Sequence, residues 1–501
     1  MTAVSAVDGR RDQAVLIRNI TVLAGSQVIT WTASLAWALI VPRSLGAQGT
    51  GVFTLSVAAS QMIGVFIGLG MAPLLVREIS INRERAPRLL ATAIVLRLAL
   101  AVPALGALAL LARLAHFEGD ELVGLYLGWG VAAVYALYGP FQAALQAIER
   151  MQYLAYSDVI TKTGVIVISI VLVLVGLGAI SLLSTTVAVM AGVLVLNFVW
   201  IRRYFHLQWR VTASDVRNLV MDSLPYCGFA IFFNFYLWID SLMLGVMTSV
   251  QVVGWYGMPT KLFGTLMFLP VILSTAWLPR LAAAHRQESD EPLSEAARSP
   301  LEIVVALSLP VCAGVILLAG PVIHFLYGPD FDQSAPIMTL LALSVPPMYL
   351  NIMVNQVLVA ANRQMVWTKA MGVACVVNPA LNLILIPYFQ RTHGNGGIGA
   401  GLSLLITELV LAGIAVVAVR SCFRGSFVGR TVRAAAATAG MAGAMLLAQQ
   451  FGFVAQLVVG LLVYPLLAWG FRVVAPDELR QLLEMVKSVR KSRRSDTPAP
   501  A

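Results

Sequence analysis

The sequence predicts an all-α polytopic membrane protein that crosses the bilayer about fourteen times. Three observations support this fold class: the low charge, the length of the apolar segments, and the alternation of positive charge between successive connections. The chain has 501 residues, of which 59% are hydrophobic and only 12% are charged. Soluble domains carry about a quarter charged residues, so most of this chain is unsuited to contact with water.

Each predicted span is long enough to cross the bilayer as a helix. At a rise of about 1.5 Å per residue, about 20 apolar residues are needed to cross the hydrocarbon layer. The last two predicted spans are the least regular, because one is rich in Ala and Gly and the other contains Pro465. The predicted spans are residues 20–41, 52–75, 89–112, 122–146, 154–176, 180–201, 223–247, 252–278, 302–326, 335–360, 366–388, 398–419, 432–449 and 453–473.

The positive charge indicates how the spans are oriented. Of the 34 Lys and Arg residues, three lie in odd-numbered connections (Arg43, Arg113 and Arg391) and three lie within spans, which leaves 28 in the even-numbered connections and the termini. By the positive-inside rule, both termini are expected on the cytoplasmic side of the membrane. This asymmetry explains the net charge of +10 without a nucleic-acid partner.

Neither a cleavable leader nor a metal centre is predicted. About nineteen mostly polar residues precede the first span, which is itself too long for the apolar core of a signal peptide. The four cysteines, Cys227, Cys312, Cys375 and Cys422, are scattered and form no CxxC pair. A disulfide framework or a zinc site is therefore not expected.

The chain repeats itself, which predicts two lobes. Residues 176–192 align with residues 397–413 without a gap, and a weaker match joins Gly51-Val-Phe to Gly254-Trp-Tyr. Six spans per repeat is an even number, so the halves share one orientation. Paired bundles of this kind hold a substrate site between them and expose it alternately. The predicted domains are a cytoplasmic N-terminal segment (1–19), an N-lobe (20–201), a cytoplasmic linker (202–222), a C-lobe (223–419), an extra helix pair (420–474) and a basic cytoplasmic tail (475–501).

Charged residues inside spans indicate function or pairing, because a charge near the bilayer centre costs at least about 2.5–3.5 kcal/mol. Asp158 and Lys162 lie four residues apart and are expected to form a structural ion pair. Arg97 and Lys261 have no acidic residue nearby in the sequence. They predict either an anion-binding cavity suited to phosphate groups, or snorkelling or an ion pair between helices.

Other polar residues inside spans suggest a cation site. Asn378 and Asn382 flank a proline, which removes a backbone donor and frees a carbonyl. A broken helix of this kind is able to coordinate a cation, although Asn side chains also bridge helices. Glu408 has no acidic counterpart in the first repeat, which suggests a role in coupling. Asn351 and Asn355 are weaker candidates.

Four segments, taken in order, resemble bacterial polysaccharide transporters, also called oligosaccharide flippases: residues 41–80, 238–282, 326–343 and 378–403. These transporters belong to the multidrug/oligosaccharidyl-lipid/polysaccharide exporter superfamily. The second segment carries that family's aspartate in the seventh span, Asp240. The resemblance implies two six-helix lobes around a cationic cavity. It also implies a substrate, an oligosaccharide linked to polyprenyl diphosphate, which is moved to the outer leaflet for cell-surface polysaccharide biosynthesis.

The resemblance further implies roles for single residues and partners. Membrane lipids would surround the protein, and a glycan polymerase and glycosyltransferases would work beside it. H⁺ or Na⁺ would drive transport, and no cofactor is expected. The residues implied to bind the diphosphate and acidic sugars are Arg97, Lys261 and Arg18, and those implied to couple transport to the ion are Asp240, Asn378, Asn382 and Glu408.

Other functions compete with this one. Twelve spans are usual among polysaccharide transporters. With its extra helix pair, this chain also resembles the lipid II flippase branch. A multidrug/cation antiporter would favour an acidic cavity over one carrying cationic side chains. A glycan polymerase would need catalytic acids or His on a long outer loop. Here Asp330, Asp332 and His393 lie in short connections and are expected to be solvated, so an enzyme is not predicted. A scaffold without transport activity also stays open.

Overall fold

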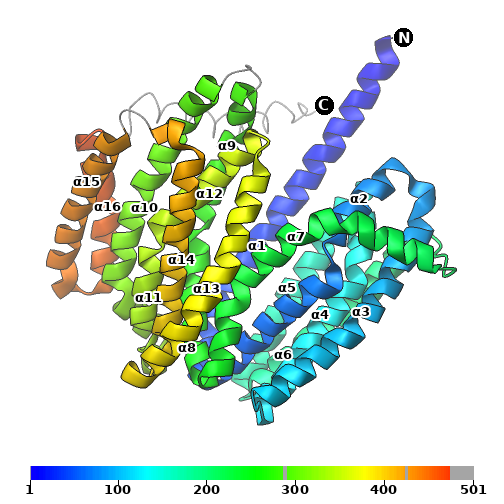
Figure 1. Cartoon of the computed structure of the whole chain (residues 1–501), viewed down its shortest axis with the longest axis horizontal. Helices are drawn as coiled ribbons and strands as arrows, with labels where there is room; N and C mark the ends of the chain where they lie inside the picture. Colours follow the sequence, from blue (N-terminus) through cyan, green and yellow to red (C-terminus); the bar gives the residue numbers. More distant parts are fainter. Residues whose placement is uncertain (1, 286–289, 424–426, 474–501) are drawn as a thin grey trace, which may run out of the picture. The chain divides into compact units, whose positions relative to one another are not determined.

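The structure, a computed structural model, describes the backbone of residues 2–285, 290–423 and 427–473. Side chains are described from residue 34 onward, except those of residues 35, 229, 290–292 and 427. Within these ranges every regular element is a helix (Figure 1). The elements are α1 (Thr2–Gly68), α2 (Met71–Ile81), η1 (Arg83–Arg85), α3 (Ala86–Leu114), α4 (Gly119–Ala147), α5 (Met151–Leu174), α6 (Ala179–Ile201), α7 (Ala213–Met247), α8 (Val250–Leu266), α9 (Phe268–His285), α10 (Asp290–Tyr327), η2 (Pro329–Phe331), α11 (Ser334–Leu343), α12 (Val345–Ala360), α13 (Gln364–His393), α14 (Gly396–Ala418), η3 (Arg420–Phe423), α15 (Phe427–Leu447), η4 (Ala448–Phe451) and α16 (Phe453–Gly470).

The candidate membrane spans agree with the predicted fold class. In the described part of the chain, 12 helices are long and apolar enough to cross a membrane. The pair α11 and α12, bent by 44°, makes one more. The remaining predicted span is the first half of α1, which continues into the second predicted span through a kink at Gly46 (φ 66°, ψ −179°). The protein is therefore all-α and multi-pass.

Two predicted boundaries differ from the structure for local reasons. The span predicted at 52–75 ends at Gly68, because Leu69 (φ 46°) and Gly70 (φ 62°) are left-handed and separate α1 from α2. The span predicted at 252–278 is interrupted at Met267, which divides it into α8 and α9.

α7 begins well before the predicted span at 223–247 because a capping box fixes its first turn. The Thr212 hydroxyl accepts from the Asp215 amide at 3.3 Å, and Asp215 Oδ2 accepts from the Thr212 amide at 2.9 Å. Arg88 Nη2, on α3, lies 2.7 Å from the same carboxylate oxygen. The Thr212 hydroxyl and amide, with the Arg88 guanidinium, hold the pKa of Asp215 at about 2.

The chain divides into two compact units. The first holds α1 to α7, the start of α8 and the end of α13, and the second holds α9, α11, α12, α15, α16 and most of α10 and α14. The predicted lobe and linker boundaries remain a prediction. The first unit comprises Met1–Met258, Leu326–Phe331 and Asn382–Gly397, and the second comprises Pro259–Phe325, Asp332–Leu381 and Ile398–Ala501.

In the first unit, the second half of α1 touches α8 through two glycines. A Cβ atom on Gly51 would lie 1.8 Å from the carbonyl oxygen of Val250, and one on Gly254 would lie 2.0 Å from that of Ala47. The contact is reciprocal, since each carbonyl belongs to the residue four positions before the other glycine. These are the two glycines that the sequence repeat matches, and a two-fold relation between the two segments predicts such a contact.

The kink of α1 is closed by Asp330, which is exposed, as the sequence predicted. Asp330, in η2, accepts a hydrogen bond from the Ala47 amide on Oδ2 at 3.1 Å. Its backbone carbonyl accepts from Trp255 Nε1 at 2.8 Å. The carboxylate therefore caps the helix that restarts after Gly46, where backbone N–H groups lack partners within the helix.

In the second unit, a tyrosine bonds the backbone at the break between α8 and α9. Pro270 lacks the N–H that would bond the Leu266 carbonyl in a continuous helix. The Tyr349 hydroxyl of α12 donates to this carbonyl at 2.7 Å. The Leu266 carbonyl, which has no donor within its own helix, thus receives one from a neighbouring helix.

The extra helix pair, α15 and α16, is bonded to α10 by two polar contacts, one part-buried and one buried. Pro310 leaves the Ala306 carbonyl without a partner in α10, and the Tyr464 hydroxyl of α16 donates to it at 3.0 Å. Nearer the start of α10, Glu302 is only 3% exposed and pairs with Arg430 of α15 at 3.1 Å. Both helices of the pair therefore contact α10 directly.

The reciprocal glycine contact predicts a sharp difference between two Gly→Ala substitutions on α8. Gly254→Ala would place a methyl group against backbone that cannot move without separating the two helices. We therefore expect the free energy of unfolding to fall by at least about 1–3 kcal/mol, or the variant not to fold. Gly264→Ala is the control, because a Cβ there meets nothing within 4 Å and Ala favours a helix by up to about 1 kcal/mol. Thermal unfolding of the purified variants in detergent measures both, and equal melting temperatures would contradict the contact.

Candidate functional site

A buried carboxylate in the first unit is held by two donors from different helices. Asp240, on α7, is 4% exposed. The Tyr256 hydroxyl of α8 donates to Oδ2 at 2.8 Å, and Asn382 Nδ2 of α13 donates to Oδ1 at 2.6 Å. Sequence reasoning placed Asp240 and Asn382 in one predicted set, and the structure brings them into contact. Tyr256 was missed, because a tyrosine in an apolar segment carries no distinguishing signal.

A second carboxylate cluster lies in the second unit. Glu408, on α14, is 2% exposed, and Asn351, on α12, is 3% exposed. Asn351 Nδ2 donates to Glu408 Oε2 at 2.7 Å and to the Glu408 backbone carbonyl at 3.2 Å. Asn351 was only a weaker candidate from the sequence, yet it is the side chain that the structure places on Glu408.

The chemistry of the two clusters is similar. Each consists of a carboxylate buried in a membrane-spanning segment, with an asparagine amide donating to one oxygen. Carboxylate and amide oxygens are ligands for a hard cation. Roles in coupling remain a prediction for Asp240, Asn382 and Glu408.

Arg97 lies in the interface between α3 and α4. Its side chain is 5% exposed, and Nη1 donates to the Ala136 carbonyl at 2.7 Å. Pro140 lacks the N–H that would bond this carbonyl within α4. Gly139 makes room, since a Cβ there would lie 2.7 Å from Nη1. Among the described residues no carboxylate lies within 4.0 Å of Arg97. The partner of its guanidinium is a backbone carbonyl.

The other predicted residues are more dispersed. Lys162 Nζ lies 2.9 Å from Asp158 Oδ2, so the expected contact is present on α5. Lys261, on α8 in the second unit, has an exposed side chain. Asn378 is fully buried on α13, one turn before Asn382. Arg18 falls in the part of α1 whose side chains lie outside the described residues. Roles in substrate binding for Arg97, Lys261 and Arg18 remain predictions.

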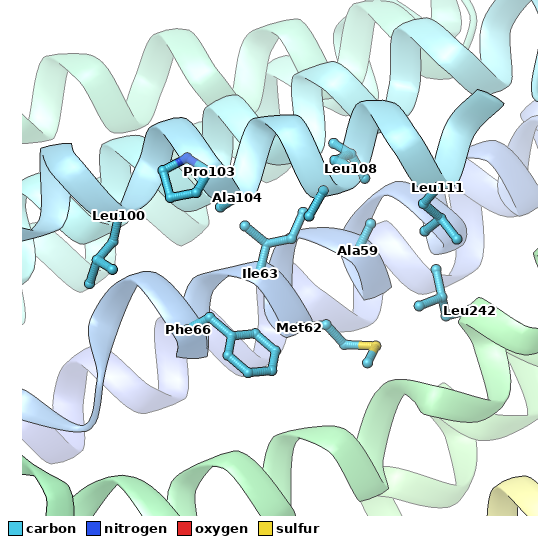
Figure 2. A pocket seen from close by; sticks show the side chains of 11 residues that line it. Ala59, Met62, Ile63, Phe66, Leu100, Pro103, Ala104, Leu108, Leu111 and Leu242 are labelled. Carbon is cyan, nitrogen blue, oxygen red and sulfur yellow. The ribbon is translucent and has the colours of Figure 1, made fainter. Parts of the chain in front are cut away.

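The first unit also contains an apolar pocket of about 460 Å³ between α1, α3 and α7. Figure 2 shows Ile63 and Phe66 of α1 on one side, Leu100 and Leu108 of α3 on another, and Leu242 of α7. All the residues that line it are apolar. Its volume falls within the range of about 300–1,000 Å³ that holds small-molecule ligands, and its lining suits a hydrocarbon chain.

The position of Arg97 predicts different effects of two substitutions on α4. Gly139→Ala would push the guanidinium off the Ala136 carbonyl, leaving a buried donor and acceptor unsatisfied at a cost of about 1–3 kcal/mol. Gly130→Ala is the matched control, because the nearest side-chain atom, on Val187, would be 3.5 Å away. We expect a lower melting temperature for the first variant only. Equal melting temperatures of the two variants would show that the bond between Arg97 and the Ala136 carbonyl does not contribute to stability.

Comparison with protein families identifies related proteins. The family model described as "Polysaccharide biosynthesis protein" matches residues 16–285, and the MatE model matches residues 225–384. Two curated relatives come from Haloferax volcanii. "Probable flippase AglR" is 25% identical over 175 residues, and "Probable low-salt glycan biosynthesis flippase Agl15" is 20% identical over 177 residues. These matches cover 34% and 35% of this chain, and they span 35% and 36% of the relatives' own lengths.

Comparison with solved structures identifies the fold. The lipid II flippase MurJ, in an inward closed conformation, superposes with a TM-score of 0.74 at 14% identity, covering 90% of this chain and 98% of that one. An inward-facing multidrug resistance MATE family transporter gives a TM-score of 0.63 at 15% identity, covering 78% and 94%. Because the polysaccharide biosynthesis model covers more than half of the chain, the protein belongs to this family.

Proposed function

We propose that the protein is a flippase for an oligosaccharide linked to polyprenyl diphosphate, which it moves from the cytoplasmic to the outer leaflet for cell-surface polysaccharide biosynthesis. The observation that carries this proposal is the family match over residues 16–285, which includes the first eight predicted spans. The names of the two curated relatives, which describe both as probable flippases, support it. The fold shared with a lipid II flippase agrees with it.

The apolar pocket of the first unit supports a lipid-linked substrate. A polyprenyl chain is a long hydrocarbon, and a pocket lined only by apolar side chains of α1, α3 and α7 would accept part of it without leaving a polar group unbonded. The charged end of the substrate needs other residues. We keep Arg97, Lys261 and Arg18 as the proposed ligands of the diphosphate, because guanidinium and ammonium groups suit phosphate oxygens.

The two carboxylate–asparagine clusters support coupling to a cation gradient. Under this proposal, Asp240 with Asn382, and Glu408 with Asn351, bind and release H⁺ or Na⁺ as the protein alternates between its inward-open and outward-open states. Asn378 is proposed as a further ligand. The proposed orientation places both termini in the cytoplasm, and a glycan polymerase and glycosyltransferases are the proposed partners.

A second candidate function is transport of lipid II for peptidoglycan synthesis. Two observations favour it over the multidrug antiporter: the TM-score of 0.74 to a lipid II flippase, and the extra helix pair α15 and α16. Both substrates carry a polyprenyl diphosphate, so the residues proposed for that group would serve either one. The glycan distinguishes the two.

Deletion of the gene, followed by analysis of polyprenyl-linked sugars, tests the proposed function. We expect a complete oligosaccharide to accumulate on the cytoplasmic side, because assembly would continue while translocation stops. Accumulation of lipid II instead would favour the second candidate. Build-up of unextended units on the outer side would contradict flipping and indicate a polymerase.

The same deletion strain allows the coupling role to be measured with two matched substitutions. Glu408→Gln keeps the size of the buried side chain but removes its titration, so we expect transport to slow and to lose its dependence on the ion gradient. Glu84→Gln, at an exposed position in η1, is the control and should restore transport fully. Equal protein levels must be established first. Full transport by the Glu408 variant with unchanged ion dependence would contradict the coupling role.

A further inference from the structure

A cavity of about 660 Å³ lies within the second unit where the extra helix pair meets α10 and α11. The end of α10 and the start of α11 form one side of it. The turn η4 and the first turns of α16 form the other side. Its size is typical of sites for small ligands. The extra pair therefore contributes part of a cavity as well as packing against α10.

Two aromatic rings form an apolar wall of this cavity. The ring centroids of Phe325, on α10, and Phe453, on α16, are 4.8 Å apart at an interplanar angle of 46°. Phe325 is 57% exposed, so part of its ring is available to a ligand. Gly320 and Gly452 also line the cavity, and a Cβ at either position would meet nothing within 4 Å. The space beside the rings is open.

Polar groups face the same space. His324 Nδ1 and Asp332 Oδ1 are 2.9 Å apart, an arrangement that leaves the second carboxylate oxygen and Nε2 of the imidazole for a ligand. Gln449 is exposed, while Gln456 is 3% exposed and its amide is held by a bond from Nε2 to the Met445 carbonyl at 3.3 Å. Amide and imidazole groups both donate to and accept from hydroxyls, and a carboxylate accepts from them.

The lining excludes an anionic ligand. Among the described residues, none of the side chains that line the cavity is Lys or Arg, and Asp332 would repel phosphate. A ligand with one face of C–H groups and a rim of hydroxyls fits both the rings and the polar groups. A pyranose sugar has this chemistry, whereas a hydrocarbon chain would offer no partner to the second oxygen of Asp332 or to the Gln449 amide.

We propose that this cavity binds an uncharged sugar unit of the transported glycan. The proposal rests on the proposed flippase function and on the predicted topology, in which both connections that build the cavity lie on the outer side. The sugar would be held there once it has crossed the membrane. The extra helix pair would thereby take part in release of the glycan.

Saturation-transfer NMR on the full-length protein in nanodiscs of deuterated lipid tests this proposal. The probes are methyl glycosides of glucose, galactose, mannose and N-acetylglucosamine. We expect transfer to the ring protons of at least one glycoside, with affinity weakened roughly two- to tenfold by Gln449→Ala or Asp332→Ala, each of which removes one ligand contact. Gln450→Ala is the matched control, since Gln450 is exposed in the same turn but does not line the cavity.

Each outcome of this experiment decides the proposal. No transfer to any glycoside, or affinity unchanged in both the Gln449 and Asp332 variants, would overturn it. All variants change exposed side chains, and unaltered melting temperatures would show that the fold is kept. Binding is measured without transport. A chain that flips its substrate but binds no glycoside overturns only this proposal, and one that binds but does not flip overturns only the flippase function.

Discussion

A backbone carbonyl that a proline leaves unbonded inside the bilayer must find its donor elsewhere, because no water is present to supply one. At three prolines of this protein the donor is a side chain from a neighbouring helix. Each of these three prolines is therefore accompanied by a hydrogen bond that joins two helices. Three such bonds are present in the described residues: Arg97 to Ala136 beside Pro140, Tyr349 to Leu266 beside Pro270, and Tyr464 to Ala306 beside Pro310.

The same constraint applies to the buried polar groups for which we propose functions. The carboxylates of Asp240 and Glu408 are buried and bonded by asparagine amides, so uptake of an ion there must compete with an existing hydrogen bond. Arg97 is committed to a carbonyl, and a diphosphate would have to draw it away. Tyr464 bonds α16 to α10, two of the helices that line the cavity of the second unit. Polar groups in the interior thus serve both the fold and the proposed transport cycle.

Sequence reasoning accounts for much of the fold and part of the site. The length of the apolar segments predicted the spans, and the repeat matched Gly51 to Gly254, which the structure places in contact. It could not find Tyr256, because this hydroxyl is distinguished only by its hydrogen bond to Asp240, which lies on another helix. Glu302 stands at the edge of a predicted span and resembles a solvated residue, yet Arg430 covers it. These contacts join distant parts of the chain, and local patterns do not encode them.

A double-mutant cycle between Tyr464 and Pro310 tests the proline constraint most directly. With Pro310 present, Tyr464→Phe should lower the free energy of unfolding by about 1–3 kcal/mol, because the Ala306 carbonyl loses its donor. In the Pro310→Ala background the loss should be smaller, since the restored N–H bonds that carbonyl within α10. Tyr388→Phe, at an exposed position, controls for loss of a hydroxyl. An equal loss in both backgrounds would contradict the account.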